Sequence, residues 1–372
     1  MLAFRWAAFC FSLFSAASAT SGVQSRSDAN TSQSDMVAAA VDAMMTLYDD
    51  ATGLWDPNGT TTSWWQSGVA LWALSEYMIK SGSNDYLEQA EATVDIQRAP
   101  LAWWPEGGGD FRADSTDDTG WWALAMLSMY ELTGNQTYLD IAIEDEEYMW
   151  NYWNTTTCGG GLIWSISALS YHNAISNELF LELTAKLHNL IPDDTKYLDR
   201  ALKEWEWFSN SGMINSQSLI NDGLTDDTAC VNNNMTTWTY NQGVILGGLV
   251  ELFQATSDSS YLDSARAIAD AVVNSTLLVQ DGVLTEPCSD EESCEPNGTN
   301  FKGIFMRELA KLNAVLDDGT YTDFIAENAD SAYANARNGT DFYGFLWMGP
   351  FDVVTVGTQE AAVHLLTAAY LG

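Results

Sequence analysis

Apolar positions in this chain recur in pairs of helix-like segments separated by short polar turns. The second segment of each pair opens with a Tyr-Leu-x-x-Ala pattern, which begins at Tyr86, Tyr138, Tyr197, Tyr261 and, in a weaker copy, Tyr321. The segments before these copies are rich in small and aromatic residues and span 64–79, 120–133, 173–189, 240–255 and 301–316. A unit that recurs along a whole chain is typical of architectures built from one repeated motif. The pattern therefore predicts successive helical hairpins.

Two further helical segments, 35–47 and 358–371, have no partner beside them in the sequence. If they pair with each other, the chain has six hairpins, which can close into a ring. We therefore predict an all-α protein, an (α/α)6 barrel of six helical hairpins in two concentric rings. Strand-like runs are confined to 161–166 and 353–356. No Pro- or Ser-rich linker interrupts the chain, so we expect a single domain over residues 35–372.

The N-terminus has the composition of a secretory signal peptide. Arg5 supplies a positive charge, residues 6–14 form a short apolar stretch, and Ala17-Ser18-Ala19 offers a small-residue cleavage site. We expect the signal peptide to cover 1–19 and a flexible segment to follow over 20–34. The apolar stretch is too short to cross a bilayer, and no later segment is long and apolar enough to form a transmembrane segment.

The C-terminal segment 358–372 contains Gln359, Glu360 and His364, which makes it a poor hydrophobic tail for a GPI anchor. We expect a monomeric protein that is secreted and located outside the cell or in the cell wall. Asn-x-Ser/Thr sequons agree with secretion and are candidate glycosylation sites; they begin at Asn30, Asn58, Asn135, Asn154, Asn234, Asn274, Asn297 and Asn338.

The cysteines also fit an oxidising compartment. Removal of the signal peptide would take away Cys10 and leave Cys158, Cys230, Cys288 and Cys294, an even number that allows three pairings. Cys288–Cys294 is the easiest loop to close, which would leave Cys158–Cys230 as the second disulfide. The sequence itself does not decide among the pairings.

The charge of the chain restricts its partners. A net charge of −37 at pH 7 excludes nucleic acid as a natural partner and argues against docking on anionic lipid. A neutral ligand would avoid this repulsion. The histidines His172, His188 and His364 show no metal-ligand spacing, and no Gly-rich nucleotide-binding motif is evident. We therefore expect neither a metal nor another cofactor.

Two adjacent acids, Asp117 and Asp118, stand just before the aromatic pair Trp121-Trp122 of a predicted helix. Negative charge is favoured at a helix N-terminus, so the acids could simply cap the helix. Two carboxyls beside aromatic surfaces are also the minimum needed to cleave a glycosidic bond, one to protonate the leaving oxygen and one to attack the anomeric carbon. Other acid pairs are interpreted as solvated turns; they lie at 193–194, 226–227 and 317–318.

The predicted ring favours a site over simple capping. Its inner helices would begin at one rim, where the acid pair would meet the aromatic and amide residues of the other helix entrances, at 64–66, 173–177, 240–243, 301–303 and 358–360. Flat aromatic faces suit the CH surfaces of sugars, and amides suit their hydroxyls. Capping alone predicts no such clustering, so we expect a carbohydrate site at this rim.

Candidate sugar contacts follow from these entrances, with core packing or helix capping as the alternative for each. On a helix, consecutive residues point about 100° apart, so each Trp pair should supply one packing ring and one cleft ring. Asp222, before Gly223, is interpreted as a turn residue. The candidate aromatic platforms are Trp64, Trp122 and Trp347, and the candidate hydroxyl contacts are Asn173, Asn177, Tyr240, Asn241 and Gln242.

Motifs in order along the chain resemble glycoside hydrolase family 76. They are Asp-Asp-x-x-Trp-Trp-Ala-Leu-Ala at 117–125, Cys-Gly-Gly-Gly at 158–161, and the stretches 172–180, 238–243 and 301–307. The resemblance extends from about residue 36 to the end. It implies an (α/α)6 barrel and retaining, endo-acting cleavage of α-1,6-mannan. It also implies that Asp117 is the nucleophile and Asp118 the general acid/base.

The resemblance leaves more than one activity open. Our leading prediction is a secreted mannan endo-1,6-alpha-mannosidase that acts on α-1,6-linked mannan or a mannose-containing cell-wall glycan. Fungal cell-wall members of the family imply a rival, a transglycosidase that acts on the mannose-containing glycan of GPI-anchored proteins and transfers them to wall polysaccharide. A non-catalytic mannan-binding protein is the third possibility, against which the intact pair of Asp117 and Asp118 argues.

Overall fold

The computed structural model describes residues 31–55, 64–191, 193–289, 294 and 296–372. Contacts divide the chain into Met1–Ser32 and Gln33–Gly372, and every described helix belongs to the second unit. The predicted signal peptide, Cys10, most of the segment 20–34 and the sequons at Asn30 and Asn58 lie outside the described residues.

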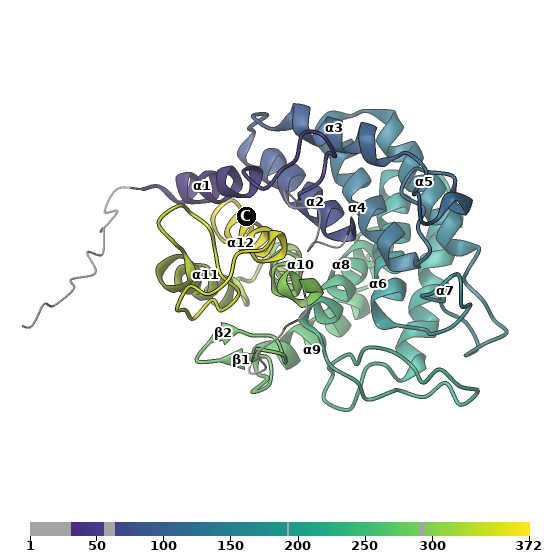
Figure 1. Ribbon diagram of the computed structural model, residues 1–372. Coiled ribbons are helices and arrows are strands. Elements are labelled where there is room, and N and C mark those ends of the chain that lie inside the picture. The colour runs from purple at the N-terminus through teal and green to yellow at the C-terminus, as the bar shows by residue number, and fades with distance from the viewer. Residues whose placement is uncertain (1–30, 56–63, 192, 290–293, 295) are drawn as a thin grey trace, which may run out of the picture. The chain divides into compact units, whose positions relative to one another are not determined.

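Within the described ranges the protein is predominantly helical, as the sequence predicts (Figure 1). The α-helices are α1 (Gln33–Met45), α2 (Trp64–Ser81), α3 (Leu87–Gln97), α4 (Thr116–Thr133), α5 (Gln136–Trp150), α6 (Ala174–Leu190), α7 (Thr195–Ser211), α8 (Thr239–Thr256), α9 (Ser260–Val273), α10 (Phe301–Leu316), α11 (Thr322–Ser331) and α12 (Val356–Tyr370). The remaining elements are the 3-10 turns η1 (Pro105–Gly107) and η2 (Pro296–Thr299), the π-helical turn η3 (Ala332–Ala336), and an antiparallel pair of strands, β1 (Val279–Gln280) and β2 (Val283–Leu284).

The even-numbered helices contact one another in a closed circuit, which we call the helix ring. Helix α2 contacts α4, and the contacts continue through α6, α8 and α10 to α12, which returns to α2. Helices α3, α5, α7 and α9 each pack against the even-numbered helix before them, and α11 contacts both α10 and α12. Helix α1 packs against α12, so the two terminal segments pair as predicted; Figure 1 shows α12, in yellow, beside α1 and α10.

Some local predictions are wrong. Residues 161–166 form no named strand; Leu162 and Ser165 make only isolated bridges, and the two strands lie at 279–284 instead. Residues 353–356 form no strand either, since α12 begins at Val356. Helix α4 begins at Thr116 rather than at residue 120, so the acid pair belongs to its first turn. Acids are favoured in that turn by the helix dipole, which explains the earlier start.

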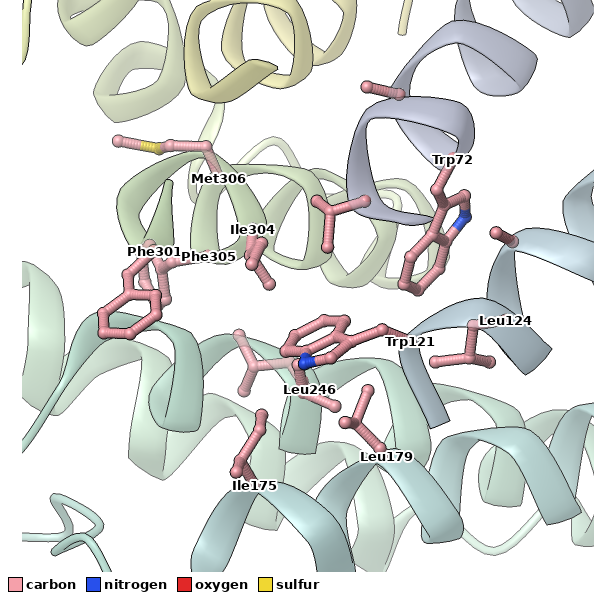
Figure 2. Packing of buried hydrophobic residues seen from close by; sticks show 14 of the residues in the cluster. Trp72, Trp121, Leu124, Ile175, Leu179, Leu246, Phe301, Ile304, Phe305 and Met306 are labelled. Atoms are coloured by element: carbon pink, nitrogen blue, oxygen red, sulfur yellow. The ribbon is translucent and has the colours of Figure 1, made fainter. Parts of the chain in front are cut away.

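One apolar core lies between the helices of the ring. Figure 2 shows side chains that converge from five of them, among which are Trp72, Trp121, Ile175, Leu246 and Phe305. Their relative exposures are at most 3%. Burial of this much aliphatic and aromatic surface is the main stabilising contribution to the ring.

Two glycines let neighbouring helices approach at the level of the backbone. A Cβ atom on Gly243 of α8 would lie 2.6 Å from the Cα atom of Phe305 in α10. A Cβ atom on Gly303 of α10 would lie 2.3 Å from the Cα atom of Ala361 in α12. Only glycine fits at these positions, so α8, α10 and α12 make close backbone contact near their N-terminal ends.

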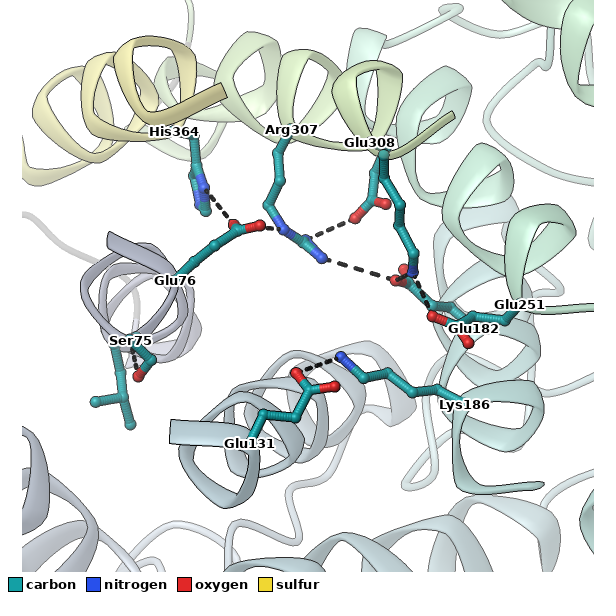
Figure 3. A network of polar contacts seen from close by, with 11 residues as sticks. Ser75, Glu76, Glu131, Glu182, Lys186, Glu251, Arg307, Glu308 and His364 are labelled. Carbon is teal, nitrogen blue, oxygen red and sulfur yellow. Dashed lines mark hydrogen bonds and ion pairs between the residues drawn. The ribbon is translucent and has the colours of Figure 1, made fainter. Parts of the chain in front are cut away.

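Largely buried ion pairs join helices of the ring farther from the helix starts than these glycines (Figure 3). Arg307 of α10 is 6% exposed and lies 3.1 Å from the carboxylate of Glu76 in α2 and 2.6 Å from that of Glu308. Further pairs that join different helices of the network are Arg307–Glu182 (3.7 Å), Lys311–Glu182 (2.9 Å), Lys311–Glu251 (2.7 Å) and Lys186–Glu131 (2.9 Å). Separation of such helices would leave buried charges without partners, which is costly. The network therefore opposes slippage between them.

Candidate active site

Asp117 and Asp118 occupy the first turn of α4, directly after Thr116 and the N-cap residue Ser115. The carboxylate of Asp117 accepts the backbone N–H of Asp118 at 3.0 Å and the indole N–H of Trp164 at 3.0 Å. A local role at the helix terminus accounts for the first of these bonds, because Asp117 accepts an N–H of the first turn that has no partner within the helix. It does not account for the second, which brings an aromatic side chain from the α5–α6 loop onto the acid pair.

The two carboxyls differ in their electrostatic surroundings. Burial raises the pKa of Asp117 to about 6, while the N–H of Asp118 and the side chains of Ser115 and Trp164 act in the opposite direction. Burial raises the pKa of Asp118 well above its ordinary range, and the charges of Asp117 and Asp114 raise it further. As the pH rises, Asp117 is the carboxyl that ionises first. Close to neutral pH the pair holds one carboxylate and one proton.

Asp117 lines a cavity of about 570 Å³, a volume in the range of small-molecule binding sites. The starts of α2, α4, α6, α8 and α10 all reach this cavity, so five of the six predicted helix entrances meet at one cleft; the entrance at 358–360, in α12, is not in its described lining. From these starts come Trp65, Asp117, Trp121, Asn173, Tyr240 and Phe301. From the connecting segments come Trp164, Tyr171, Asp222, Trp238, Cys288, Asn297 and Gly298.

Stacked aromatic rings form one side of the cleft. The ring centres of Tyr240 and Phe301 are 3.8 Å apart, those of Trp65 and Trp121 are 5.4 Å apart, and those of Trp121 and Tyr240 are 6.3 Å apart. All three pairs are close to parallel, and the residues come from four different helices. Rigid flat apolar faces of this kind suit the CH surface of a sugar ring.

A polar wall adjoins the aromatic rings. The hydroxyl of Tyr171 donates to the carboxylate of Asp222 and accepts the side-chain N–H of Asn233 at 2.9 Å. The backbone carbonyl of Asp222 accepts the N–H of Ala174 at 2.8 Å, which fixes this loop to the start of α6. Burial raises the pKa of Asp222, and bonds from Tyr171 and Trp238 oppose the rise. Asp222 is therefore a cleft residue, and its interpretation as a mere turn residue was wrong.

Two of the predicted sugar contacts, Asn173 and Tyr240, line the cleft. Asn173 also caps α6, because its side-chain oxygen accepts the N–H of Ser176 at 3.3 Å. Its two roles are compatible, since the side-chain N–H group of an amide is a separate donor.

The predicted platforms Trp64 and Trp122 do not line the cleft. Trp122 is fully buried, and its ring centre lies 4.5 Å from that of Phe111 and 5.0 Å from that of Trp64. One ring of each of these two pairs lines the cleft, but it is Trp65 and Trp121 rather than the predicted Trp64 and Trp122, and neither ring of the third pair, Trp103-Trp104, is in the described lining. The sequence pattern could not show which ring of a pair faces the cleft, because contacts with neighbouring helices set the rotation of each helix about its own axis.

The remaining four predicted contacts also lie away from the cleft lining. Asn177 is fully buried, bonds both backbone groups of Leu162 and the carbonyl of Asn173, and so anchors a loop. Gln242 holds the backbone of Ile220 in the same way, through bonds of 2.7 and 2.8 Å. Asn241 is fully buried within α8, and Trp347 is 2% exposed with the ammonium of Lys302 4.5 Å from its ring centre. Asn177 and Gln242 therefore anchor loops, and Asn241 and Trp347 lie in the interior.

Disulfides fix two of the segments that surround the cleft. Cys158 is bonded to Cys230, with Cα atoms 5.3 Å apart, and Cys288 to Cys294, with Cα atoms 5.1 Å apart. The first bond joins the α5–α6 and α7–α8 connections, which carry Trp164, Tyr171 and Asp222. The second lies beside the cleft, where Cys288 is part of the lining.

Other features of the described chain bear on cofactors and on location. No group of three or more histidine, cysteine or acidic side chains in the described ranges could hold a metal ion. None of the described helices combines the length and the apolar character needed to cross a membrane. Of the described sequon asparagines, Asn135, Asn234, Asn274 and Asn297 are exposed, and Asn154 and Asn338 are half-buried.

A second cavity, of about 580 Å³, lies among the ion pairs of the ring. Its lining includes Glu76, Lys186, Arg307 and Lys311, whose charges are matched by one another and by neighbouring carboxylates. It does not include the acid pair of α4. The cleft at the helix starts is therefore the better candidate for catalysis.

Comparison with known sequences identifies relatives over most of the chain. The model for glycosyl hydrolase family 76 matches residues 32–371. Mannan endo-1,6-alpha-mannosidase DFG5 of Saccharomyces cerevisiae is 25% identical over 355 residues, which cover 89% of this chain and 76% of that protein. Mannan endo-1,6-alpha-mannosidase DCW1 of the same yeast is 26% identical over 329 residues, covering 82% and 71% respectively.

Solved structures share the fold. The GH76A alpha-1,6-mannanase of Salegentibacter sp. HEL1_6 has a TM-score of 0.79 at 24% identity, covering 91% of this chain and 98% of that one. An inactive variant of that enzyme, in which two consecutive aspartates are replaced by asparagine, was solved with alpha-1,6-mannotriose and has a TM-score of 0.81 at 24% identity, covering 91% and 99%. Dfg5 of Chaetomium thermophilum, in complex with glucosamine, has a TM-score of 0.80 at 20% identity, covering 91% and 90%.

Proposed function

Because this chain belongs to glycosyl hydrolase family 76, we propose that it cleaves α-1,6-mannosidic bonds within mannan chains and retains the configuration at the anomeric carbon. The observation that carries this proposal is the acid pair on the first turn of α4: Asp117 lines an aromatic cleft, Asp118 follows it directly in the helix, and the two carboxyls have unequal pKa values. A relative with alpha-1,6-mannanase in its name is inactive when two consecutive aspartates are replaced, which supports the same pair as the catalytic groups here.

Asp117 is the nucleophile of the proposed reaction. It ionises first, and two N–H donors, from Asp118 and Trp164, hold its carboxylate in place. It attacks the anomeric carbon and forms a covalent glycosyl-enzyme, while the bond to the leaving oxygen breaks. The bond from Trp164 also orients the carboxylate, because the indole N–H is fixed to a loop that is itself bonded to α4 through Thr116.

Asp118 is the general acid and then the general base. Burial and the neighbouring charge of Asp117 keep it protonated, so it can give its proton to the departing glycosidic oxygen. Consumption of the Asp117 charge in the covalent intermediate removes this repulsion, which lowers the pKa of Asp118 and prepares it to accept a proton from the incoming water. The water attacks the anomeric carbon, the bond to Asp117 breaks, and Asp117 is released as a carboxylate, so only Asp118 changes its role from acid to base.

The cleft residues fit a neutral polyhydroxylated substrate. Trp65, Tyr240 and Phe301 offer aromatic surface for sugar rings, with the buried Trp121 packed behind them, and Asp222, Tyr171 and Asn173 offer groups for hydroxyls. A neutral sugar also avoids the repulsion that a net charge of −37 would exert on an anionic ligand. α-1,6-Linked mannan satisfies both conditions, and no cofactor is needed for this chemistry.

The closed circuit of even-numbered helices supports a finer description of the fold as an (α/α)6 barrel, with the helix ring inside and the other helices outside. We further propose that residues 35–372 form one catalytic domain and that the protein is secreted, after removal of residues 1–19, as a monomer. The two disulfides and the sequons support a secretory route.

A second candidate function is transfer of the mannosyl group to a sugar hydroxyl instead of water. The observation that favours it is the similarity to a Dfg5 solved in complex with glucosamine, a sugar other than mannose, as an acceptor sugar would be. Asp118 would activate an acceptor hydroxyl in the same way as it activates water. Incubation with linear α-1,6-mannan and added wall-glycan acceptors separates the two, because transfer products exceed free reducing ends only in the second case.

The proposal is tested with Asp117→Asn and Asp118→Asn in the full chain. We expect each to lower turnover of linear α-1,6-mannan by at least about a hundredfold, because each removes a group that acts in the transition state. Asp193→Asn is the matched control, since Asp193 is an exposed acid of a second Asp pair outside the cleft lining. Thermal unfolding establishes that all three variants are folded. Nearly full activity in both cleft variants would refute catalysis by this pair and favour a binding protein.

A further inference from the structure

One sequon lies on the cleft itself. The asparagine of Asn297-Gly298-Thr299 is exposed, and both Asn297 and Gly298 line the cavity that contains Asp117. Of the sequon asparagines that the structure describes, the others do not belong to the wall of this cavity; that wall contains Asn297 alone among them. A glycan attached at Asn297 would therefore differ from glycans at the other sequons, because its first sugar would lie where the proposed substrate binds.

The turn that carries Asn297 is firmly attached to the helix ring. The carbonyl of Pro296 accepts the hydroxyl of Thr299 at 2.6 Å and the side-chain N–H of Gln66, from α2, at 3.0 Å. The hydroxyl of Thr355, at the N-cap of α12, donates to the hydroxyl of Thr299 at 3.3 Å. These bonds hold the turn η2 at the junction of α2, α10 and α12, which fixes the point of attachment relative to the acid pair.

We propose that Asn297 carries an N-linked glycan that occupies the mouth of the catalytic cleft and competes there with the substrate. This inference rests on the proposed function, because the competition arises only if the cleft binds mannose chains. N-linked glycans contain mannose units, some of them α-1,6-linked, so the glycan belongs to the class of ligand that the proposed cleft recognises. The protein is thus partly inhibited by its own modification.

The tether determines the size of this inhibition. A flexible attached ligand reaches an effective concentration of about 1 to 10 mM near its anchor. If the glycan binds the cleft with a dissociation constant of about 1 mM, it raises the apparent KM for free mannan roughly twofold to tenfold. It leaves kcat unchanged, because saturating substrate displaces a tethered competitor.

Occupancy of the site is tested first. The full chain is secreted from a eukaryotic host, and glycopeptides that contain Asn297 are analysed by mass spectrometry. We expect a glycan on most molecules. An unmodified Asn297 in the secreted protein would overturn the inference, whatever the activity of the protein.

Competition is tested with Asn297→Gln and with enzymatic removal of glycans from the unchanged chain. We expect both to lower the KM for linear α-1,6-mannan roughly twofold to tenfold at constant kcat. Enzymatic removal converts Asn297 to aspartate, so the neutral glutamine variant shows that the effect comes from loss of the glycan. The matched control is Thr276→Ala, which destroys the exposed sequon at Asn274, outside the cleft lining, and leaves that asparagine in place. Its KM should equal that of the unchanged chain.

The two possible failures are distinguishable. Absence of mannan cleavage in every form of the protein contradicts the proposed function. Normal cleavage with the same KM before and after loss of the Asn297 glycan contradicts only the further inference. An equal fall in KM for Thr276→Ala also contradicts it, because the effect would then not depend on the cleft.

Discussion

At the scale of single residues, Trp164 connects the acid pair to the loop before α6. Its side chain is 39% exposed, although its indole N–H donates to Asp117 at 3.0 Å. Its backbone N–H donates to the carbonyl of Tyr171 at 2.8 Å, and its own carbonyl accepts the N–H of Thr116 at 3.0 Å. An exposed aromatic held by these bonds serves both to border the cleft and to stabilise the charge on Asp117.

Replacement of Trp164 by phenylalanine should shift the acid side of the pH–activity profile. The change removes a donor to the carboxylate, and loss of a donor disfavours the charged form, so the pKa of Asp117 rises from about 6. A hydrogen bond to a charged group corresponds to roughly one pH unit or more. We expect kcat/KM to fall off at a pH higher by roughly one unit.

The measurement is kcat/KM for α-1,6-mannan as a function of pH. Trp103→Phe is the control, since Trp103 is 55% exposed and does not line the cleft. An acid side that stays in place for Trp164→Phe would mean that Trp164 does not act on the charge of Asp117.

At the scale of elements, adjacent tryptophans on α2 have opposite tasks. The ring of Trp65 stacks on Trp121 in the cleft, whereas that of Trp64 packs against Trp122 and donates its N–H to Gln97 at 2.9 Å. Neighbours on a helix point in directions about 100° apart, so one face of α2 faces the cleft and the next packs against α4 and the loop before it.

Trp65→Ala and Trp64→Ala should therefore have different effects on KM. We expect the first to raise the KM for mannan at least about tenfold, since stacking of one ring contributes about 1–3 kcal/mol. We expect the second to leave KM within about twofold and to lower the unfolding temperature, because it removes packed area without a substrate contact. Kinetics and thermal unfolding of both variants decide the matter. Equal changes in KM would contradict the separation of tasks.

The helical repeat made the pairing of elements predictable, and with it the convergence of helix starts on one rim. It could not choose between Trp64 and Trp65, because the rotation of α2 depends on contacts with α4 and α12. It also could not find Asp222 or Trp164. Both lie on irregular connections whose positions come from distant bonds, such as Tyr171 to Asp222, and no local periodicity records them.

At the scale of the whole molecule, buried carboxyls link stability to pH. Burial raises the pKa of Glu204 and Glu286 to about 8 and that of Glu146 to about 7. The ordinary value for these groups is 4.5, so between about pH 4.5 and 8 the folded protein binds more protons than the unfolded chain. Stability contributed by these groups is complete below that interval and is lost as the pH rises through it.

We therefore expect the unfolding temperature to be highest near pH 4.5–5 and to decrease steadily towards pH 8. The large negative net charge acts in the same direction, because carboxylates repel one another in the compact state. Calorimetry at constant ionic strength provides the measurement. An unfolding temperature that rises between pH 5 and pH 8 would contradict the assignment.

Glu204→Gln isolates one contribution to this dependence. Glu204 is fully buried on α7 and accepts the indole N–H of Trp153 at 2.5 Å, a bond that an amide oxygen can keep. Glutamine imitates the protonated carboxyl, so the variant should match the unchanged protein at pH 5 and unfold at a higher temperature at pH 8. Glu206→Gln, an exposed position on the same helix, should show no such gain.

The pairing of α12 with α1 and α2 has a consequence for synthesis. The side-chain N–H of Gln359 donates to the carbonyl of Ala40 across 319 residues of sequence, a contact that cannot form until the last helix has left the ribosome. At 5–20 residues per second, ribosomes need roughly 15–60 seconds to make that span. Until α12 has been made, the faces of α1 and α2 that it covers stay exposed, and α10 joins them once it has been synthesised. A nascent chain of this protein should therefore depend on chaperones until its final helix emerges, and loss of that helix should direct the whole chain to degradation.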